Sequence, residues 1–479
     1  MSLKKQALSG VKWTFLQQLG TQGVGFIISI ILARLLQPEE FGLIAMIYVF
    51  IGIGNVLLSA GLGSSLIRSK ELDEEDYATV FYFNLVVSIL VYIIVYFFAP
   101  YIATFYHQPI LTQLVRWLSF SFIINAFAII QTARLTKLMD FKTQTLVAIP
   151  SLIIGGTVSI VMAYMNYGVW SLIAFNLVKS LANTIQLWVY SKWHPIWSFN
   201  ISKFKQHFYF GYKLTLSGLL DIIFNNVYVL VIGKLFPAAQ VGYYQRANNL
   251  QMYPVGAIST IMGKVTYPLF AQIQDDNERL KIVYKKILQI NLYLLVPILM
   301  VAGVLATPLF RFLFTEKWLP AVPYFQILLL SGILIPLHSF NLNILKIKGR
   351  SDLFLKLGIV KKIVVAIAII MGLKYGIIGL LYSSVFSSII AFFINTYYSG
   401  RFISYSVWEQ IRDVMPIFFL AITTALFVFV FDFYTQNIFY YDLLRLIINT
   451  ILAILFYVYL SYVFKFSSLI EIIKIIKKQ

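Results

Sequence analysis

The residues best suited to chemistry in this sequence are charged and amide side chains placed within long apolar stretches. Lys179 and Asp221 lie near the middle of two such stretches, and Arg246 lies about one turn into a third. A charge at mid-bilayer costs at least about 2.5–3.5 kcal/mol on insertion scales, so it normally faces a helix-bundle interior or a wet cavity. There it can contact a polar substrate or an ion. Further candidates at helix ends or within the stretches are Arg34, Arg116, Asn225 and Gln251.

Each of these residues also has a purely structural interpretation. Buried amides commonly join neighbouring membrane helices through hydrogen bonds worth about 0.6 kcal/mol on average. Lys179 could form an ion pair or extend its long stem to the interface, and Asp221 could be part of an ion pair with no transport role. Arg34 and Arg116 could be interfacial anchors. Lys179 and Asp221 lie in consecutive apolar stretches that belong to different lobes of the repeat described below, so they could meet at the cavity between those lobes.

The elements that must position these residues are membrane-spanning helices. The 479 residues are 60% hydrophobic and 12% charged, whereas a soluble domain has roughly 45–50% apolar and about 25% charged residues. A span needs about 20 mostly apolar residues. This criterion predicts an all-α membrane protein with about fourteen transmembrane helices, over residues 10–33, 41–63, 78–99, 113–133, 144–165, 169–190, 211–232, 241–263, 286–306, 323–344, 358–373, 377–398, 413–432 and 443–463.

The positive charges orient these spans. With the N-terminus in the cytoplasm, the cytoplasmic gaps collect 29 of the 38 Lys and Arg residues and the opposite gaps collect seven, with Lys179 and Arg246 inside spans. Positive residues concentrate on the cytoplasmic side of membrane proteins. The formal charge of +19 therefore indicates membrane orientation rather than nucleic-acid binding. We expect a multi-pass protein of a bacterial inner membrane with both termini in the cytoplasm.

The chain also contains an internal repeat. ARLLQPEEFGL near residue 34 corresponds to GKLFPAAQVGY two hundred residues later, which pairs Gly42 with Gly242. Asn84 is followed by Leu, as is Asn291 at an offset of 207. This offset spans six helices, an even number, so both copies have the same orientation and are related by an axis along the membrane normal. We expect two six-helix lobes around a central cavity, residues 1–205 and 206–405, followed by a helix pair and an amphipathic tail, 406–479.

The sequence matches none of the motifs sought for nucleotide binding, metal binding or thiol chemistry. GAISTIMGKV has the wrong spacing for a phosphate-binding Walker A loop, because six residues separate Gly256 from Gly263 and Val follows Lys264. The chain has no cysteine and only four scattered histidines. We therefore expect no cofactor, no metal site and no catalytic residue. The alternative of a membrane enzyme for glycan assembly would require large external loops, and PEEFG occupies a gap of only about seven residues.

Several stretches resemble a known family. They are ARLLQPEEFGLIAM with GLGSSLIR, GKLFPAAQVGYYQRANNLQMYP, VTYPLFAQIQDD and NILKIKGRSD. They are similar to the bacterial polysaccharide transporters of the multidrug/oligosaccharidyl-lipid/polysaccharide exporter superfamily, and most similar to flippases of lipid-linked O-antigen and colanic-acid-type repeat units. The resemblance covers nearly the whole chain. It implies fourteen helices, a cationic central cavity and an apolar groove for a lipid tail at the last two helices.

This resemblance implies a function for the residues named above. The substrate would be an undecaprenyl-pyrophosphate-linked oligosaccharide that crosses to the outer leaflet by alternating access, for O-antigen, lipopolysaccharide or exopolysaccharide biosynthesis. Membrane lipids and a polysaccharide polymerase with other assembly proteins would be its partners, with no nucleic acid. A sodium ion, a proton or the membrane potential would drive it, with Asp221 as the coupling or charge-balancing group. Arginine and lysine suit pyrophosphate, because they form charge-assisted hydrogen bonds. The substrate-binding set would be Arg246, Lys179, Arg34, Arg116, Asn225 and Gln251.

A cation-coupled drug or small-molecule antiporter of the same superfamily is the second interpretation. Those relatives usually have twelve spans, so the added helix pair argues against it.

Overall fold

In a computed structural model, the described part of the chain is almost entirely helical and contains no strand. The structure describes residues 3–59 and 61–477, without the side chains of residues 3–8, 11, 260–265 and 475–477. The outermost residues at both termini lie outside this part. The helices are α1 (Leu3–Leu35), α2 (Pro38–Ser59), α3 (Leu62–Arg68), α4 (Glu74–Tyr106), α5 (Leu111–Ser119), α6 (Ser121–Lys137), α7 (Phe141–Tyr164), α8 (Val169–Ser191), α9 (Ile201–Asn225), α10 (Val227–Leu235), α11 (Ala238–Gln272), α12 (Asn277–Val304), α13 (Ala306–Phe314), η1 (Glu316–Ala321), α14 (Val322–Ile347), α15 (Ser351–Leu373), α16 (Gly376–Ile403), α17 (Val407–Thr435), α18 (Asp442–Val463) and α19 (Ser467–Lys477).

Local sequence explains where several helices begin. α4 starts with a capping box, because the Asp73 side chain accepts from the backbone N–H of Asp76 while the Asp76 side chain accepts from that of Asp73. α17 starts in the same way with Ser406 and Glu409. Gly168 has φ +56° directly before α8, a backbone conformation that glycine adopts without a steric cost.

The predicted spans all coincide with helices, but fewer qualify as membrane spans by their composition. Eleven described helices are long and apolar enough to cross a bilayer, or twelve if α9 and α10, which meet at a 47° bend, count as one span. The two other predicted spans fall on α11 and α15. The first half of α11 is rich in amides, and α15 carries Lys356, Lys361 and Lys362. The all-helical membrane fold is confirmed, and the number fourteen stays a prediction.

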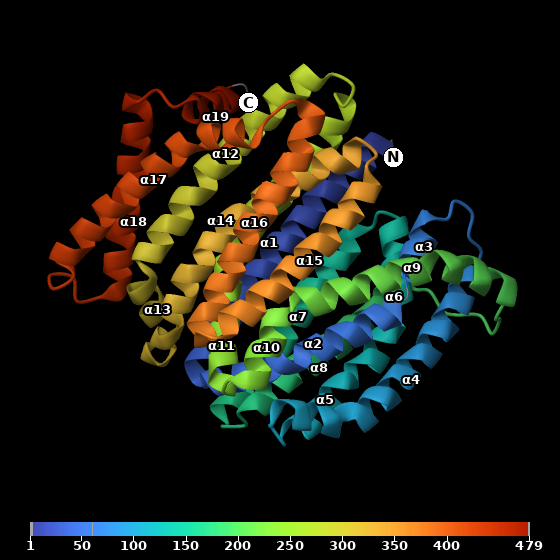
Figure 1. Ribbon diagram of the computed structural model, residues 1–479. Helices are drawn as coiled ribbons and strands as arrows, with labels where there is room; N and C mark the ends of the chain where they lie inside the picture. Colours follow the sequence, from blue (N-terminus) through green and yellow to red (C-terminus); the bar gives the residue numbers. More distant parts are fainter. Residues whose placement is uncertain (1–2, 60, 478–479) are drawn as a thin grey trace. The chain divides into compact units, whose positions relative to one another are not determined.

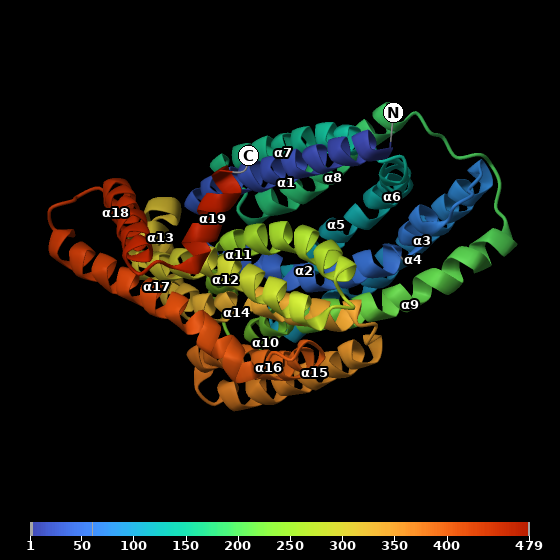
Figure 2. The same ribbon diagram turned by 90° about the horizontal axis from the view of Figure 1, so that it is seen from above.

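The chain forms two compact units, Met1–Gly242 and Tyr243–Gln479. In the first unit, α7 packs between α1 and α8, and the three helices run side by side in both views (Figures 1 and 2). α4 packs on α5 and α6, and α9 packs on α2, α3 and α4. In the second unit, α14 and α15 pack on α16, and α12 contacts both α14 and α17. α17 and α18 form a hairpin, drawn in red tones in Figure 1.

Two helix starts recur at about the offset of the predicted sequence repeat. α2 begins at Pro38, and α11 begins at Ala238. α8 begins directly after Gly168 and α16 begins at Gly376, and both of these glycines have a positive φ. The boundary between the compact units differs from the predicted lobe boundary near residue 205, because α9 and α10 pack within the first unit. The lobes 1–205 and 206–405 therefore remain a prediction based on the repeat.

Candidate functional site

Lys179 lies on α8 in the first unit, and its side chain is exposed in the structure. Its ammonium group lies 5.9 Å from the ring centroid of Phe175, one turn earlier on the same helix. α7 approaches α8 closely here, because an added Cβ at Gly155 would lie 2.8 Å from the Cβ of Lys179. Of the described residues, none forms an ion pair with Lys179. In this structure, Lys179 therefore does not form an ion pair with Asp221, the residue it was predicted to approach.

Asp221 and Asn225 lie near the C-terminal end of α9, and both are exposed in this unit. The helix ends at Asn225, and α10 begins at Val227 after the 47° bend. Asn226 at the bend donates its side-chain N–H to the carbonyl oxygen of Ile222 at 2.8 Å. A broken helix leaves backbone groups that must be satisfied locally, and membrane proteins place such breaks where the backbone lines protein or a cavity.

Arg34 and Arg116 lie at helix ends in the first unit. Arg34 is in the last turn of α1. Arg116 of α5 donates its Nε–H to the carbonyl oxygen of Tyr96 at 3.3 Å, and its guanidinium lies 4.2 Å from the centroid of the Tyr96 ring. This combination of hydrogen bond and cation–π contact agrees with the anchoring interpretation of Arg116.

Arg246 and Gln251 lie on α11 in the second unit, and both are buried, at 6% and 1% exposure. The guanidinium of Arg246 lies 4.9 Å from the ring centroids of both Phe314 and Trp318. Gln251 packs against α14, where an added Cβ at Gly332 would overlap its amide nitrogen. The structure therefore places these two predicted residues on one helix, and the other five in the first unit.

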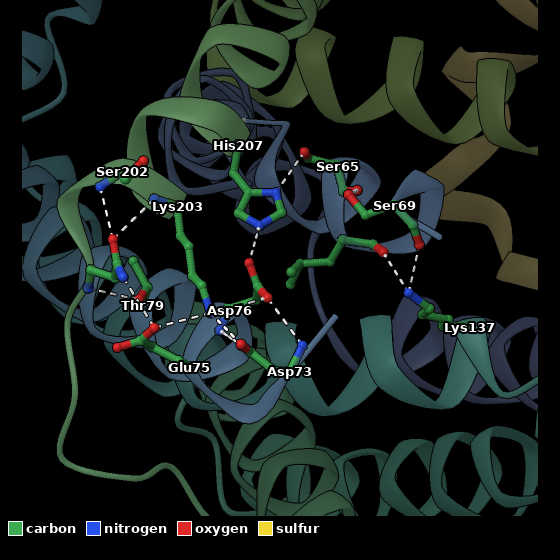
Figure 3. Close-up of polar contacts among 12 residues, drawn as sticks. Ser65, Ser69, Asp73, Glu75, Asp76, Thr79, Lys137, Ser202, Lys203 and His207 are labelled. Atoms are coloured by element: carbon green, nitrogen blue, oxygen red, sulfur yellow. Dashed lines mark hydrogen bonds and ion pairs between the residues drawn. The ribbon is translucent and has the colours of Figure 1, made fainter. Parts of the chain in front are cut away.

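A polar network that the sequence analysis missed joins the start of α4 to the start of α9 in the first unit (Figure 3). The Lys203 ammonium contacts Asp73, Glu75 (3.0 Å) and Asp76 (3.6 Å). The hydrogen bond from Lys203 is the main reason why the pKa of Asp73 falls to about 2. His207 lies one turn further along α9 and reaches Asp76 with one ring nitrogen.

The segment between α8 and α9 is bound to the same carboxylates. The indole N–H of Trp193 donates to Glu74 at 2.5 Å, and the hydroxyl of Ser198 donates to Glu75 at 2.7 Å. The Asn200 side chain also donates to Glu75, at 3.1 Å. A cue was present in the sequence: five of the six residues from Glu71 to Asp76 are acidic, and a lysine and a histidine follow at the start of α9. The sequence alone does not show that these groups pair, because about 130 residues separate the acidic segment from Lys203 and His207.

A groove in the second unit lies among α12, α17, α18 and α19. Its volume is about 560 Å³, and its lining is almost entirely apolar. Ile298, Ile454 and Val458 form part of its wall, and Leu469 and Ile472 of α19 also line it. The hydroxyl of Tyr457 donates to the carbonyl oxygen of Tyr293 at 2.9 Å, so these polar atoms in the wall are paired. The groove can therefore hold a hydrocarbon chain, and α18 forms one of its sides, together with Thr424 of α17.

Within the described residues, no group of three His, Asp or Glu side chains could hold a metal ion.

Comparison with known proteins places these features in a family. Residues 31–323 match the family described as polysaccharide biosynthesis protein. Lipopolysaccharide biosynthesis protein WzxC of Escherichia coli (strain K12) is 25% identical over 82% of this chain and 82% of its own length. Succinoglycan biosynthesis transport protein ExoT of Rhizobium meliloti (strain 1021) is 28% identical over 70% of this chain and 68% of its own length.

Among solved structures, the inward closed conformation of the lipid II flippase MurJ has the same fold. It superimposes with a TM-score of 0.74 at 14% identity, over 95% of this chain and 99% of that one. A match over 95% of the chain is too extensive to leave out the C-terminal helix pair.

Proposed function

Because the chain belongs to the family of polysaccharide biosynthesis proteins, we propose that it is a flippase for lipid-linked oligosaccharides. It moves repeat units carried on undecaprenyl pyrophosphate from the cytoplasmic to the outer leaflet of a bacterial inner membrane, for surface polysaccharide biosynthesis. The relatives named for lipopolysaccharide biosynthesis and for succinoglycan transport support this assignment.

The observation that carries the proposal is the apolar groove beside the helix pair. A substrate with a polyprenyl tail and a charged, sugar-bearing head needs two environments, since burying the unpaired charge in hydrocarbon costs many kcal/mol. The groove of about 560 Å³ suits the tail. α17 and α18 form part of it, and a twelve-helix antiporter has no such helix pair. The groove therefore favours the flippase over the drug antiporter.

Cationic residues suit the head of the substrate. We assign pyrophosphate contacts to Arg246 and Lys179 first and to Arg34 next, because guanidinium and ammonium groups form charge-assisted hydrogen bonds with phosphate. Arg116, Asn225 and Gln251 complete the proposed set. Asp221 would balance charge or couple transport to a sodium ion, a proton or the membrane potential. The termini would be cytoplasmic, and a polymerase would take the product at the outer leaflet.

A deletion strain tests the function. Loss of surface polysaccharide, with lipid-linked repeat units accumulating in the cell and recovery on complementation, is the expected result. Unchanged polysaccharide with raised drug sensitivity would instead establish the antiporter. Formation of a new glycan product by the purified protein in detergent, where no membrane separates two compartments, would establish an enzyme.

A further inference from the structure

The second helix of each repeat begins with the same kind of turn. At the start of α2, the N–H of Glu40 donates to the carbonyl oxygen of Gln37 at 3.1 Å. At the start of α11, the N–H of Gln240 donates to the carbonyl oxygen of Pro237 at 2.9 Å. In both helices the fifth residue is a glycine, Gly42 in Pro38–Gly42 and Gly242 in Ala238–Gly242. Both segments belong to the first compact unit.

The two glycines contact each other's helix in a reciprocal way. A Cβ added at Gly42 would overlap the carbonyl oxygen of Ala238 and lie 3.1 Å from the backbone nitrogen of Gly242. A Cβ added at Gly242 would overlap the carbonyl oxygen of Pro38 and lie 3.3 Å from the backbone nitrogen of Gly42. Each glycine thus faces the residue that begins the other helix, as a local two-fold axis between the repeats requires.

The contact is buried and made of backbone. Gly42, Gly242 and Pro38 are buried, and Ala238 and Val241 are 2% and 0% exposed. The overlapping atoms are carbonyl oxygens, so no side-chain rotation could make room for a methyl group. Small residues allow membrane helices to approach this closely, and the resulting contact is held by van der Waals packing. Such a contact can separate without breaking ion pairs of its own.

We propose that Gly42 and Gly242 form a closing contact for the transport path, on the side of the membrane opposite the Lys- and Arg-rich gaps, and that it separates once in each transport cycle. This proposal rests on the proposed function, because alternating access requires one side to be closed while the other is open. The repeat places the contact on the predicted axis between the lobes. Both helices begin in gaps that the charge bias assigns to the external side.

The first test uses the protein after it has folded. The chain has no cysteine, so Ala238→Cys introduces a single thiol beside Gly42. We expect a membrane-impermeant maleimide, added outside the cells, to label this thiol during transport and then to stop transport, because the attached group prevents closure. Leu235→Cys, exposed at 55%, is the control and should be labelled with no loss of transport.

The second test shifts the equilibrium between closed and open states. In the Ala238→Cys background, Gly42→Ala and Gly242→Ala should raise the labelling rate of the introduced thiol about tenfold, as expected when a minor open state becomes dominant, and should reduce surface polysaccharide. Gly256→Ala on α11 is the matched control, because nothing lies within 4 Å of its added Cβ. Alanine favours helix more than glycine does, so weakened helix formation cannot explain a loss.

The outcomes separate this proposal from the proposed function. If the Ala238→Cys protein sustains polysaccharide export but its thiol is never labelled during export, or is labelled without effect, the closing contact is wrong and the flippase stands. If the deletion strain keeps normal polysaccharide, the flippase assignment fails first.

Discussion

His207 holds Asp76 at a distance of 3.1 Å between Nε2 and Oδ1, although the two residues are 131 positions apart. The other ring nitrogen of His207 lies 2.8 Å from the hydroxyl oxygen of Ser65. A neutral imidazole can donate to the carboxylate with one nitrogen and accept from the hydroxyl with the other. The His207 side chain is 1% exposed, so this pair fastens α9 to α3 and to the start of α4.

Replacing His207 with phenylalanine should destabilise the protein by about 1–3 kcal/mol, because it leaves the buried Ser65 hydroxyl and one oxygen of Asp76 without that partner. Thermal unfolding of the purified protein in detergent measures the change. Unfolding at the parent temperature would show that the His207 hydrogen bonds contribute nothing net.

Lys203→Met should also lower the unfolding temperature, with a defined pH dependence. The hydrogen bond from Lys203 lowers the pKa of Asp73 from the ordinary value of 3.8 to about 2. A carboxyl with a lowered folded pKa stabilises the fold above its unfolded pKa, and this contribution is lost as the pH falls through the folded value. The deficit of the variant should be complete at pH 7 and pH 5 and should shrink between about pH 4 and pH 2. Lys205→Met, exposed on the same helix, should behave as the parent, and an equal effect of both substitutions would contradict this assignment.

An ion pair with a buried carboxylate, that of Asp432, joins α17 to α18. Arg445 donates two hydrogen bonds to the carboxylate of Asp432, which also accepts from the Asn449 side chain at 3.0 Å. Arg445→Ala should cost about 3–5 kcal/mol, because it leaves a buried charge without its partner. The double variant Asp432→Leu with Arg445→Leu should regain much of this loss. If the double variant is less stable than Arg445→Ala, the ion pair stabilises the hairpin by more than the cost of leaving one buried charge unpaired.

Filling the groove should block transport without unfolding the protein. Ile454 lines the groove, whereas its neighbour Leu455 does not, and the two are similarly exposed at 58% and 62%. Ile454→Trp should therefore reduce surface polysaccharide strongly, and Leu455→Trp should leave it near the parent level. Equal polysaccharide export by both variants, when both are present in the membrane in equal amounts, would show that the groove has no role in transport.

The proposed pyrophosphate contacts make a graded prediction. Lys179→Ala and Arg246→Ala should insert into the membrane normally but lose surface polysaccharide, whereas Arg116→Ala should have a smaller effect, because the Arg116 guanidinium is already engaged by Tyr96. Arg246→Lys tests geometry, because lysine keeps the charge but lacks the planar group that lies over Phe314 and Trp318. Normal polysaccharide in both alanine variants would disprove the site assignment.

The sequence predicted the features that depend on local composition. Apolar stretches of about 20 residues predicted the long helices, whereas the short helices α3, α5 and α13 were not predicted as separate elements. The predicted repeat aligns Gly42 with Gly242, and the structure brings the backbones of these two glycines close together. Length and hydropathy could not predict the bend at Asn226, which divides one predicted span into α9 and α10. The bent segment packs against α2, α3 and α4, which lie far from it along the chain.

Contacts between particular side chains could not be predicted from a single sequence, because they depend on how distant helices pack together. The positive-charge bias indicates only that Lys203 lies on the cytoplasmic side, because its acidic partners are far away along the chain. Arg246 was predicted as an intramembrane cation, but its position beside Phe314 and Trp318 follows from the packing of α11 on α13 and η1. Burial inside the unit, unlike hydropathy, is a property of the assembled helices.

Transport by the purified protein tests the central claim most directly. The chain is reconstituted into vesicles that carry a polyprenyl-pyrophosphate oligosaccharide in the inner leaflet only, and a sugar-binding reagent outside reports its arrival in the outer leaflet. We predict that the parent protein exposes the sugar, that Ile454→Trp does so far more slowly, and that Leu455→Trp matches the parent. No exposure above protein-free vesicles, under an imposed ion gradient or membrane potential of either sign, would contradict the account.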